Sequence, residues 1–316
     1  MTAPLRLGTR RSALATAQAQ RVADDLTART GRAVELVPVT TYGDTTSAAL
    51  SQIGGTGVFV SALREALLAG DVDLAVHSLK DLPTAPPEGI ALAAVPLRED
   101  PRDVLVARDG LTLGELPTGA TVGTGSPRRA AQLRALGLGL EVVDVRGNVD
   151  TRLRLVADGT VDAVVLARAG LARLGRLDEV TETLDPIQML PAPGQGALAI
   201  ECLMAHDASS TTTLDLLGTL DDAVTRLVVD AERTLLATLE AGCSAPVGAY
   251  GEAADPETGE QEPELYLRAV VSAVDGSAQV RLSATGPLGE APRIGRDLAT
   301  ELLAEGAADL MWERVQ

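Results

Sequence analysis

Short apolar runs rich in Val, Leu and Ala alternate with helix-length segments through the first two thirds of the chain. The first unit has predicted strands at residues 5–9 and 34–40. The second of these is expected to be buried because it is rich in β-branched side chains. A helix from Ser12 to about Ala28 connects them. A strand, a crossover helix and a further strand form the βαβ unit of α/β sheets. The alternation therefore predicts an α/β fold.

Two segments that interrupt the alternation of strands and helices divide it into two lobes. The chain is Pro-rich at 83–87 and is again interrupted at 98–102, which indicates a domain crossing. A second α/β unit follows, with strands at 104–107, 121–123, 141–144 and 163–167 and helices that begin at Pro127, Val149 and Ala169. After the 191–196 segment, the apolar run 197–200 is expected to return to the first domain. Two crossings between α/β lobes are typical of hinged binding clefts.

The last third has a different pattern. A helix is predicted from Ala223 to about Glu240, with Gly242 as its C-terminal stop. Alternating strands at 265–274 and 279–284 and a helix at about 294–305 complete a small α+β domain. The predicted domains are 1–97 with 195–216, then 98–194, and then 217–316.

The composition excludes several classes of protein. A net charge of -17 argues against a nucleic-acid-binding protein, which needs a basic surface. No apolar run approaches the roughly 18 to 20 residues of a membrane span, and the N-terminal residues lead directly into a strand, so we expect a soluble cytoplasmic protein without membrane partners. Two cysteines and two histidines give neither a disulfide framework nor a metal-ligand spacing, so no metal is expected.

Lys80 is the only lysine among 27 basic residues. A short predicted strand at 72–76 precedes it, and Pro83 ends the segment, so residues 77–81 should lie at the carboxyl end of a strand. Ligands of open α/β sheets bind at that end. The simpler alternative is that one lysine is an accident of composition.

Arginines cluster at three predicted helix N-termini. Ser126 and Pro127 suit the N-cap and first position of a helix that carries Arg128 and Arg129. Asn148 can cap the next helix, between Arg146 and Arg152, and Arg10 and Arg11 precede the helix at Ser12. Helix N-termini favour anions, and several separate arginines suit a ligand with several carboxylates. The alternative is that these arginines pair with acidic residues on a solvated surface.

Two further side chains could supply chemistry. Asp81 lies next to Lys80 and is better suited to stabilising a developing positive charge than to donating a proton. Cys243 lies in a glycine-flanked loop that makes it accessible, and on these grounds alone it could be reactive or inert. Cys202 lies in an apolar run and is expected to be a small core residue.

Together these segments resemble the porphobilinogen deaminase family, also called hydroxymethylbilane synthases. The resemblance covers essentially the whole chain and lies in eight ordered segments: residues 7–12, 54–60, 77–83, 98–103, 123–129, 145–152, 193–197 and 239–243. It implies two α/β lobes similar to type II periplasmic binding proteins and a small α+β C-terminal domain. It also implies a transferase of porphyrin (tetrapyrrole, haem) biosynthesis that joins four porphobilinogens head-to-tail into hydroxymethylbilane and releases ammonia. We expect this enzyme to be a monomer.

The resemblance also implies roles for individual residues. A dipyrromethane cofactor would be joined by a thioether to Cys243. The residues that would hold this cofactor are Lys80, Ser78, Thr124, Ser126, Arg128 and Arg129. The residues that would hold the substrate or the extending chain are Arg10, Ser12, Arg146, Arg152 and Arg173. Asp81 would face the pyrrole nitrogens and stabilise the cations formed as ammonia leaves and as the carbon–carbon bond forms.

A few positions depart from the commoner family pattern. Thr56 stands where many members have lysine, so no cofactor contact is assigned there. Phe59, the only phenylalanine, is expected to lie in the same loop, where it would cover the site or serve in packing. The alternative function is a non-catalytic binder of a small polycarboxylate, which would leave the Cys243 loop and the third domain unexplained.

Overall fold

The computed structural model describes residues 3–40, 58–205, 208–242, 245–254 and 263–311. The chain forms two compact units, Met1–Glu99 with Ala197–Arg226 and Asp100–Gly196 with Leu227–Gln316. It crosses between them after Glu99, Gly196 and Arg226. The first crossing lies in the punctuated 98–102 segment. The three predicted domain boundaries stay a prediction, because the second and third predicted domains share one unit.

The first unit is built on a five-stranded sheet with the order β2-β1-β3-β10-β4. Strands β1, β2 and β3 are parallel, and β10 is antiparallel to both of its neighbours. The elements of this unit are β1 (Leu5–Thr9), α1 (Ala13–Thr30), β2 (Val34–Pro38), α3 (Val58–Leu68), β3 (Leu74–Ser78), the 3-10 turn η1 (Leu79–Asp81), β4 (Ile90–Ala94), β10 (Leu198–Leu203) and α7 (Ala208–Gly218).

Most predictions for this unit are confirmed. Strand β1 has the predicted bounds, Ser12 caps α1, and β10 returns to the first sheet as expected. The prediction that the second strand is buried is wrong, because β2 is an edge strand with only half-buried or exposed residues. Strand β4 and helix α7 were not predicted.

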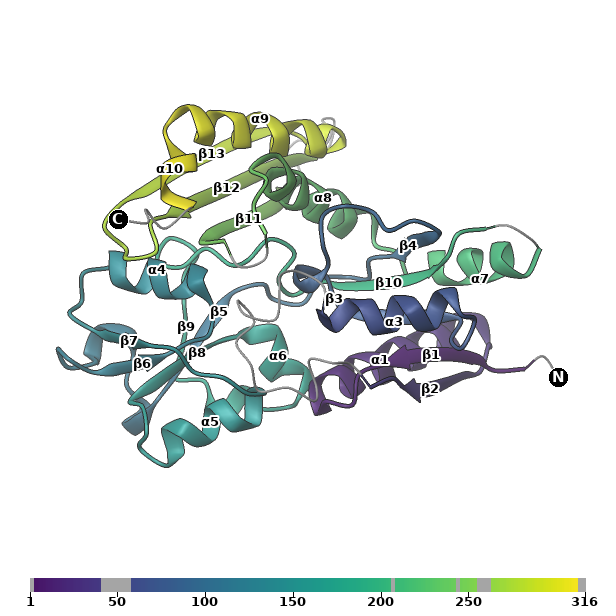
Figure 1. Cartoon of the computed structure of the whole chain (residues 1–316), viewed down its shortest axis with the longest axis horizontal. Helices are drawn as coiled ribbons and strands as arrows, with labels where there is room; N and C mark the ends of the chain where they lie inside the picture. Colours follow the sequence, from purple (N-terminus) through teal and green to yellow (C-terminus); the bar gives the residue numbers. More distant parts are fainter. Residues whose placement is uncertain (1–2, 41–57, 206–207, 243–244, 255–262, 312–316) are drawn as a thin grey trace. The chain divides into compact units, whose positions relative to one another are not determined.

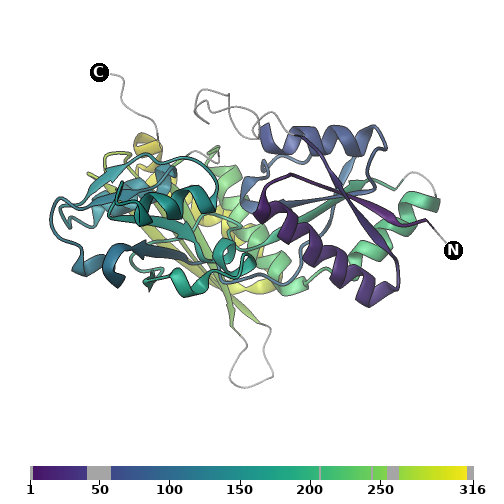
Figure 2. The ribbon, with the colours of Figure 1, turned by 90° about the horizontal axis from the view of Figure 1, so that it is seen from below.

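Helices α1 and α3 cover opposite faces of this sheet (Figure 2). Residues such as Leu7, Leu74 and Ile200 pack against Leu26 of α1 on one face. On the other face, Ala75 of β3 packs with Leu63 and Leu67 of α3. The alternation of side chains along each strand gives both helices an apolar surface to bury.

The second unit begins with another five-stranded sheet, in the order β7-β6-β8-β5-β9. Strand β6 is parallel to β7 and β8, whereas β5 is antiparallel to β8 and β9, so this sheet repeats the arrangement of the first. Its elements are β5 (Asp103–Ala107), η2 (Arg108–Gly110), η3 (Leu113–Glu115), β6 (Thr121–Gly123), α4 (Pro127–Ala135), β7 (Glu141–Val143), α5 (Val149–Ala157), β8 (Ala163–Ala167), α6 (Arg168–Arg173), η4 (Leu177–Glu179) and β9 (Glu182–Thr183).

The same unit carries an antiparallel sheet, β11-β12-β13, with helices packed on one face (Figure 1). Its elements are α8 (Ala223–Thr238), β11 (Val247–Ala254), β12 (Glu264–Ser272), β13 (Gln279–Pro287), η5 (Leu288–Glu290), α9 (Ala291–Ala304) and α10 (Ala307–Met311). The α+β character is confirmed. Gly242 is not the helix stop, because α8 ends at Thr238 and Glu240 takes the left-handed conformation, with φ 52°.

Two further observations complete the fold. None of the helices in the described ranges is long and apolar enough to cross a bilayer. Within the second unit, the β11-β12-β13 sheet is joined to the segment before Gly196, since the Ala249 N–H donates to the Pro191 carbonyl and the Gly194 N–H donates to Glu232 of α8.

Candidate active site

In the first unit, the candidate residues lie at the carboxyl ends of two neighbouring parallel strands, β1 and β3. Ser78 is the last residue of β3, and Lys80 and Asp81 lie in the turn η1 directly after it. The Leu79 N–H donates to the Ala197 carbonyl at 3.0 Å, which fixes the start of this turn. Lys80 is half-buried and Asp81 is exposed. The prediction that residues 77–81 lie at a strand's carboxyl end is confirmed.

Arg10 and Ser12 follow the neighbouring strand. Strand β1 ends at Thr9, and Ser12 is the N-cap of α1, where its Oγ accepts a hydrogen bond from the Ala15 N–H at 3.3 Å. Arg10 is half-buried. Because β1 and β3 are parallel and paired, both segments leave the sheet at the same edge. A basic and an acidic group therefore share this edge.

In the second unit, the α4 N-terminus is built as the sequence predicted. Ser126 is the N-cap and Pro127 is the first helical residue. The Thr124 side chain is buried, and its Oγ1 accepts a hydrogen bond from the Ser126 N–H at 3.2 Å. A Cβ on Gly125 would lie 2.8 Å from the Val145 carbonyl oxygen, so the turn into α4 requires glycine. The α4 N-terminus is therefore fixed against the end of β7.

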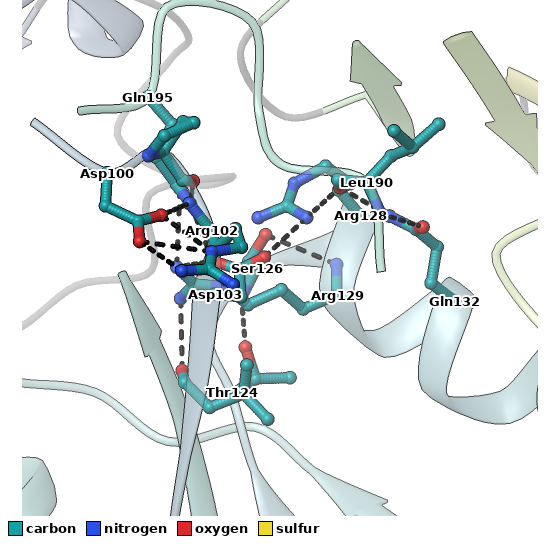
Figure 3. A network of polar contacts seen from close by, with 12 residues as sticks. Asp100, Arg102, Asp103, Thr124, Ser126, Arg128, Arg129, Gln132, Leu190 and Gln195 are labelled. Carbon is teal, nitrogen blue, oxygen red and sulfur yellow. Dashed lines mark hydrogen bonds and ion pairs between the residues drawn. The ribbon is translucent and has the colours of Figure 1, made fainter. Parts of the chain in front are cut away.

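Arg128 and Arg129 are buried, with only 4% and 5% of their surfaces exposed. Figure 3 shows both guanidinium groups around Asp103, which is fully buried at the start of β5. Asp103 Oδ2 lies 2.8 Å from Arg128 Nη1, and Oδ1 accepts from Arg129 Nη2 at 2.8 Å. Arg128 also donates to the Leu190 carbonyl, and Arg129 donates to the Val165 carbonyl. These two arginines do not form a surface pair, so the solvated-surface alternative is wrong for them.

The cluster holds more positive than negative charge. Burial alone would raise the pKa of Asp103, but Arg128 and Arg129 together hold it below its usual range, so the carboxylate is ionised. One carboxylate therefore faces two buried guanidinium groups. Arg152 is a third cation close enough to interact with Arg129. Burial lowers its pKa, repulsion from Arg129 and Arg146 lowers it further, and attraction to Asp144 raises it only in part.

The buried Nε of Arg128 has no hydrogen-bond acceptor within the described residues. A buried, ionised donor without a partner is costly, and a ligand carboxylate would satisfy it. The donor set at the start of α4 therefore fits an anionic ligand.

The remaining arginines of the prediction lie at neighbouring positions. Asn148 caps α5 as predicted and accepts from the Thr151 N–H at 2.9 Å. Arg146 is exposed and pairs with Asp144 at 2.8 Å, whereas Arg152 Nε donates to the Gly147 carbonyl at 3.0 Å. Arg173, at the end of α6, donates from Nη2 to the Gly196 carbonyl at 2.5 Å.

The sequence analysis missed Asp103 and Gln195 as parts of this cluster. Gln195 is fully buried, and its Nε2 donates to both Asp103 Oδ1 and the Pro101 carbonyl at 2.7 Å (Figure 3). A second pair nearby joins Arg102 to Asp100 at 2.6 Å. An aspartate that directly precedes the apolar run 104–107 was a usable signal, because a buried carboxylate needs cationic partners.

Several candidates cannot be placed. Cys243 and Thr56 lie outside the described residues. Phe59 was expected in the loop, but its backbone belongs to α3.

Cys202 is buried in β10 as predicted, and burial, with Glu201 nearby, raises the pKa of its thiol to about 11. Cys202 is therefore protonated and poorly reactive near neutral pH.

Comparison with known families shows which family this chain belongs to. The family model described as "Porphobilinogen deaminase, dipyromethane cofactor binding domain" matches residues 5–211, and "Porphobilinogen deaminase, C-terminal domain" matches residues 226–304. The chain belongs to the porphobilinogen deaminase family. It carries that family's dipyrromethane cofactor-binding domain, as the sequence analysis expected.

Relatives within the porphobilinogen deaminase family match along nearly the whole chain. Porphobilinogen deaminase 1 of Streptomyces avermitilis is 61% identical, over 98% of each chain. Porphobilinogen deaminase of Thermobifida fusca is 58% identical, over 98% of this chain and 96% of the relative.

Similar solved structures include a periplasmic substrate-binding protein from Coxiella burnetii. It has 15% identity and a TM-score of 0.42, and the match covers 67% of this chain and 91% of that one. The methionine-binding protein MetQ has 14% identity and a TM-score of 0.41, and the match covers 68% and 89%. The predicted α/β sheets and the predicted α+β C-terminal domain are confirmed by the strand orders of the three sheets and by the family match.

Proposed function

We propose that this chain catalyses the reaction of its family, the head-to-tail joining of four porphobilinogens into hydroxymethylbilane with release of ammonia. Membership of the family and identity of about 60% to relatives named porphobilinogen deaminase support this function over the non-catalytic binder. The structural observation that carries the proposal is the excess of buried positive charge at the α4 N-terminus. This excess suits the carboxylates of a pyrrole chain.

The cofactor would be held by the residues that the family resemblance assigns to it. Ser78 and Lys80 would bind it from the β3 turn, and Thr124, Ser126, Arg128 and Arg129 would bind it from the start of α4. The orphaned Arg128 Nε fits a carboxylate acceptor. The thioether would form at Cys243, because Cys202 is buried and its thiol stays protonated. When bound, the dipyrromethane supplies the pyrrole end from which the product chain grows.

The substrate and the lengthening chain would be held by the more exposed cations, Arg10, Arg146, Arg152 and Arg173, together with Ser12. Arg146 pairs with Asp144, and both side chains are about half exposed, so a ligand carboxylate can compete for this arginine at small cost. Burial and the cationic neighbours Arg129 and Arg146 disfavour the charged Arg152 guanidinium, Asp144 offsets this in part, and an added carboxylate would offset the remaining repulsion.

Asp81 would stabilise positive charge on the reacting pyrrole. Its side chain is exposed and stands on a short turn that the Leu79 N–H anchors to the Ala197 carbonyl, directly before β10, so it can approach a ligand without moving the sheet. Positive charge develops on the substrate as ammonia leaves, and a carboxylate fixed nearby lowers the barrier to that step. Lys80, the neighbouring cation, would hold a ligand carboxylate.

The oligomeric state and the cellular location of the enzyme also belong to this proposal. We expect the enzyme to work in the cytoplasm, as the lack of a membrane-length apolar run in the sequence suggested, and to be a monomer. Sedimentation of the purified protein across a range of concentrations tests the oligomeric state.

Incubation of the purified protein with porphobilinogen tests the proposal as a whole. We expect ammonia release and, after acid oxidation, a porphyrin absorbance spectrum. Ligand binding without ammonia release would favour the polycarboxylate binder instead.

A further inference from the structure

A second buried ionic cluster lies in the first unit and takes no direct part in the proposed chemistry. It joins three elements: Arg64 of α3, His77 of β3 and Glu201 of β10. Arg64 Nη2 lies 2.7 Å from Glu201 Oε1, and Arg64 Nε donates to Oε2 at 3.0 Å. His77 Nε2 lies 3.3 Å from the same Oε2. The His77 and Glu201 side chains are only 4% and 2% exposed.

The strand register explains why these groups meet. His77 pairs with Ala199, and Ala75 pairs with Glu201, so His77 and Glu201 are diagonal neighbours on one face of the antiparallel pair. Helix α3 covers that face, and its other buried residues there, such as Leu63 and Leu67, are apolar. Burial alone would raise the pKa of Glu201, but His77 and Arg64 together lower it to about 2. Glu201 is therefore an ionised group within an apolar layer.

Stability alone does not account for such a cluster. Buried ion pairs often contribute no more to stability than well-packed apolar residues of similar volume. The position of the cluster suggests another role, since His77 is three residues before Lys80 and four before Asp81. On the opposite face of the same strand, Ser78 Oγ accepts a hydrogen bond from Gln18 Nε2 of α1, at 3.2 Å. Gln18 is itself buried.

We propose that Arg64, His77 and Glu201 are positioning residues that fix the carboxyl end of β3, so that the following turn presents Lys80 and Asp81 in one geometry. The end of β3 is held by α3 through this cluster on one face and by α1 through Gln18 on the other. A misplacement of about 1 Å in a catalytic group can cost about 10²-fold in rate, so this precision has a direct kinetic value. This inference rests on the function proposed above for Asp81.

The test uses a variant that keeps the layer packed. In the triple variant Arg64→Met, His77→Leu, Glu201→Met, apolar side chains replace the whole cluster, so no charge is left buried alone. We expect a folded protein with the cofactor adduct present by intact mass. Its kcat for porphobilinogen consumption should fall about tenfold or more, and kcat/KM should fall by the same factor, because Asp81 acts on charge that develops only in the transition state.

A matched control lies at the other end of the same strand. Asp73, directly before β3, accepts from the Arg6 side chain at 2.7 Å and from the Arg6 backbone N–H at 2.7 Å. Asp73→Asn weakens β3 at its amino end and should leave kcat within about twofold, measured well below the melting temperatures of both variants. Equal losses of kcat in the triple variant and in Asp73→Asn would overturn the proposal, and so would an unchanged kcat in the triple variant.

A second readout does not depend on activity. Backbone hydrogen exchange across residues 78–83, measured in the adduct-free Cys243→Ala protein, should be faster when the triple substitution is added and unchanged when Asp73→Asn is added. Unchanged exchange in the triple variant would contradict the inference even if the chain had another activity. Absence of porphobilinogen turnover in the unmodified protein would instead refute the proposed function, so the two failures are distinguishable.

Discussion

Replacement of Asp103 by Asn should destabilise the second unit strongly. The substitution keeps the size of the side chain but removes the one negative charge that Arg128 and Arg129 share. Both guanidinium groups are at least nine-tenths buried, so solvent cannot take over the role of the carboxylate. The asparagine amide would also place N–H groups against a guanidinium or the Gln195 amide, which are donors themselves.

The size of the effect follows from this burial. Removing one partner of a buried ion pair typically costs about 3 to 5 kcal/mol, because an uncompensated charge stays in the interior. For a domain of this size, each kcal/mol corresponds to roughly 2 to 4 °C in melting temperature, so we expect a decrease of about 6 to 20 °C. Asp144→Asn is the matched control, since Asp144 and its partner Arg146 are 57% and 46% exposed. An exposed pair of this kind contributes about 1 kcal/mol or less.

The difference in the free energy of unfolding between the protein and its Asp103→Asn variant should also depend on pH. The pKa of Asp103 is lower in the folded chain than in the unfolded chain, so the carboxylate stabilises the fold above its unfolded pKa of about 4. This contribution is lost as the pH falls below that value toward the folded pKa. The stability gap between the unmodified protein and Asp103→Asn should therefore be constant from pH 7 to pH 5 and narrow below about pH 4.

Urea unfolding and calorimetry of the adduct-free Cys243→Ala protein, with and without Asp103→Asn, measure this gap without a contribution from bound cofactor. A loss below about 1 kcal/mol at pH 7, or one no larger than that of Asp144→Asn, would refute the conclusion that Asp103 neutralises the arginine pair.

Three other substitutions test the proposed roles. Asp81→Asn should keep the melting temperature and the adduct but lower turnover by about 10²-fold or more in a steady-state porphobilinogen assay, and near-normal turnover would exclude its role. Lys80→Arg should lower activity and cofactor occupancy despite the retained charge, because the guanidinium is bulkier and has a fixed fork; full activity would make the single lysine an accident of composition. Arg146→Leu or Arg152→Leu should stall elongation at intermediate lengths, visible by native mass spectrometry after limited substrate, and an unaltered ladder would reduce both arginines to surface charges.

The sequence predicted the local features of the fold well. Strands β1, β6 and β8 have the predicted bounds. The N-caps Ser126 and Asn148 were also predicted, since capping depends on residues only a few positions apart. By contrast, β2 looked like a buried strand, and its position at the sheet edge depends on which strands pair, which a single segment does not reveal.

The long-range parts of the site could not be predicted in the same way. The arginines at α4 were identified as anion ligands, but their burial depends on Asp103, 26 residues before Arg129, and on Gln195, 66 residues after it. The cluster of Arg64 and Glu201 joins residues 137 positions apart. Pairings of this kind are fixed by sheet order and strand register, which only the folded chain shows.

Intact-mass measurement of the purified protein is the most direct test of the central claim. The account predicts a covalent mass excess equal to two linked pyrrole units on the protein without substitutions. It predicts the same excess on Cys202→Ala, because the buried Cys202 thiol carries no cofactor. It predicts the bare polypeptide mass for Cys243→Ala, with the fold retained. The account would be contradicted if the protein without substitutions had only the polypeptide mass both before and after incubation with porphobilinogen. It would also be contradicted by an adduct that survives on Cys243→Ala.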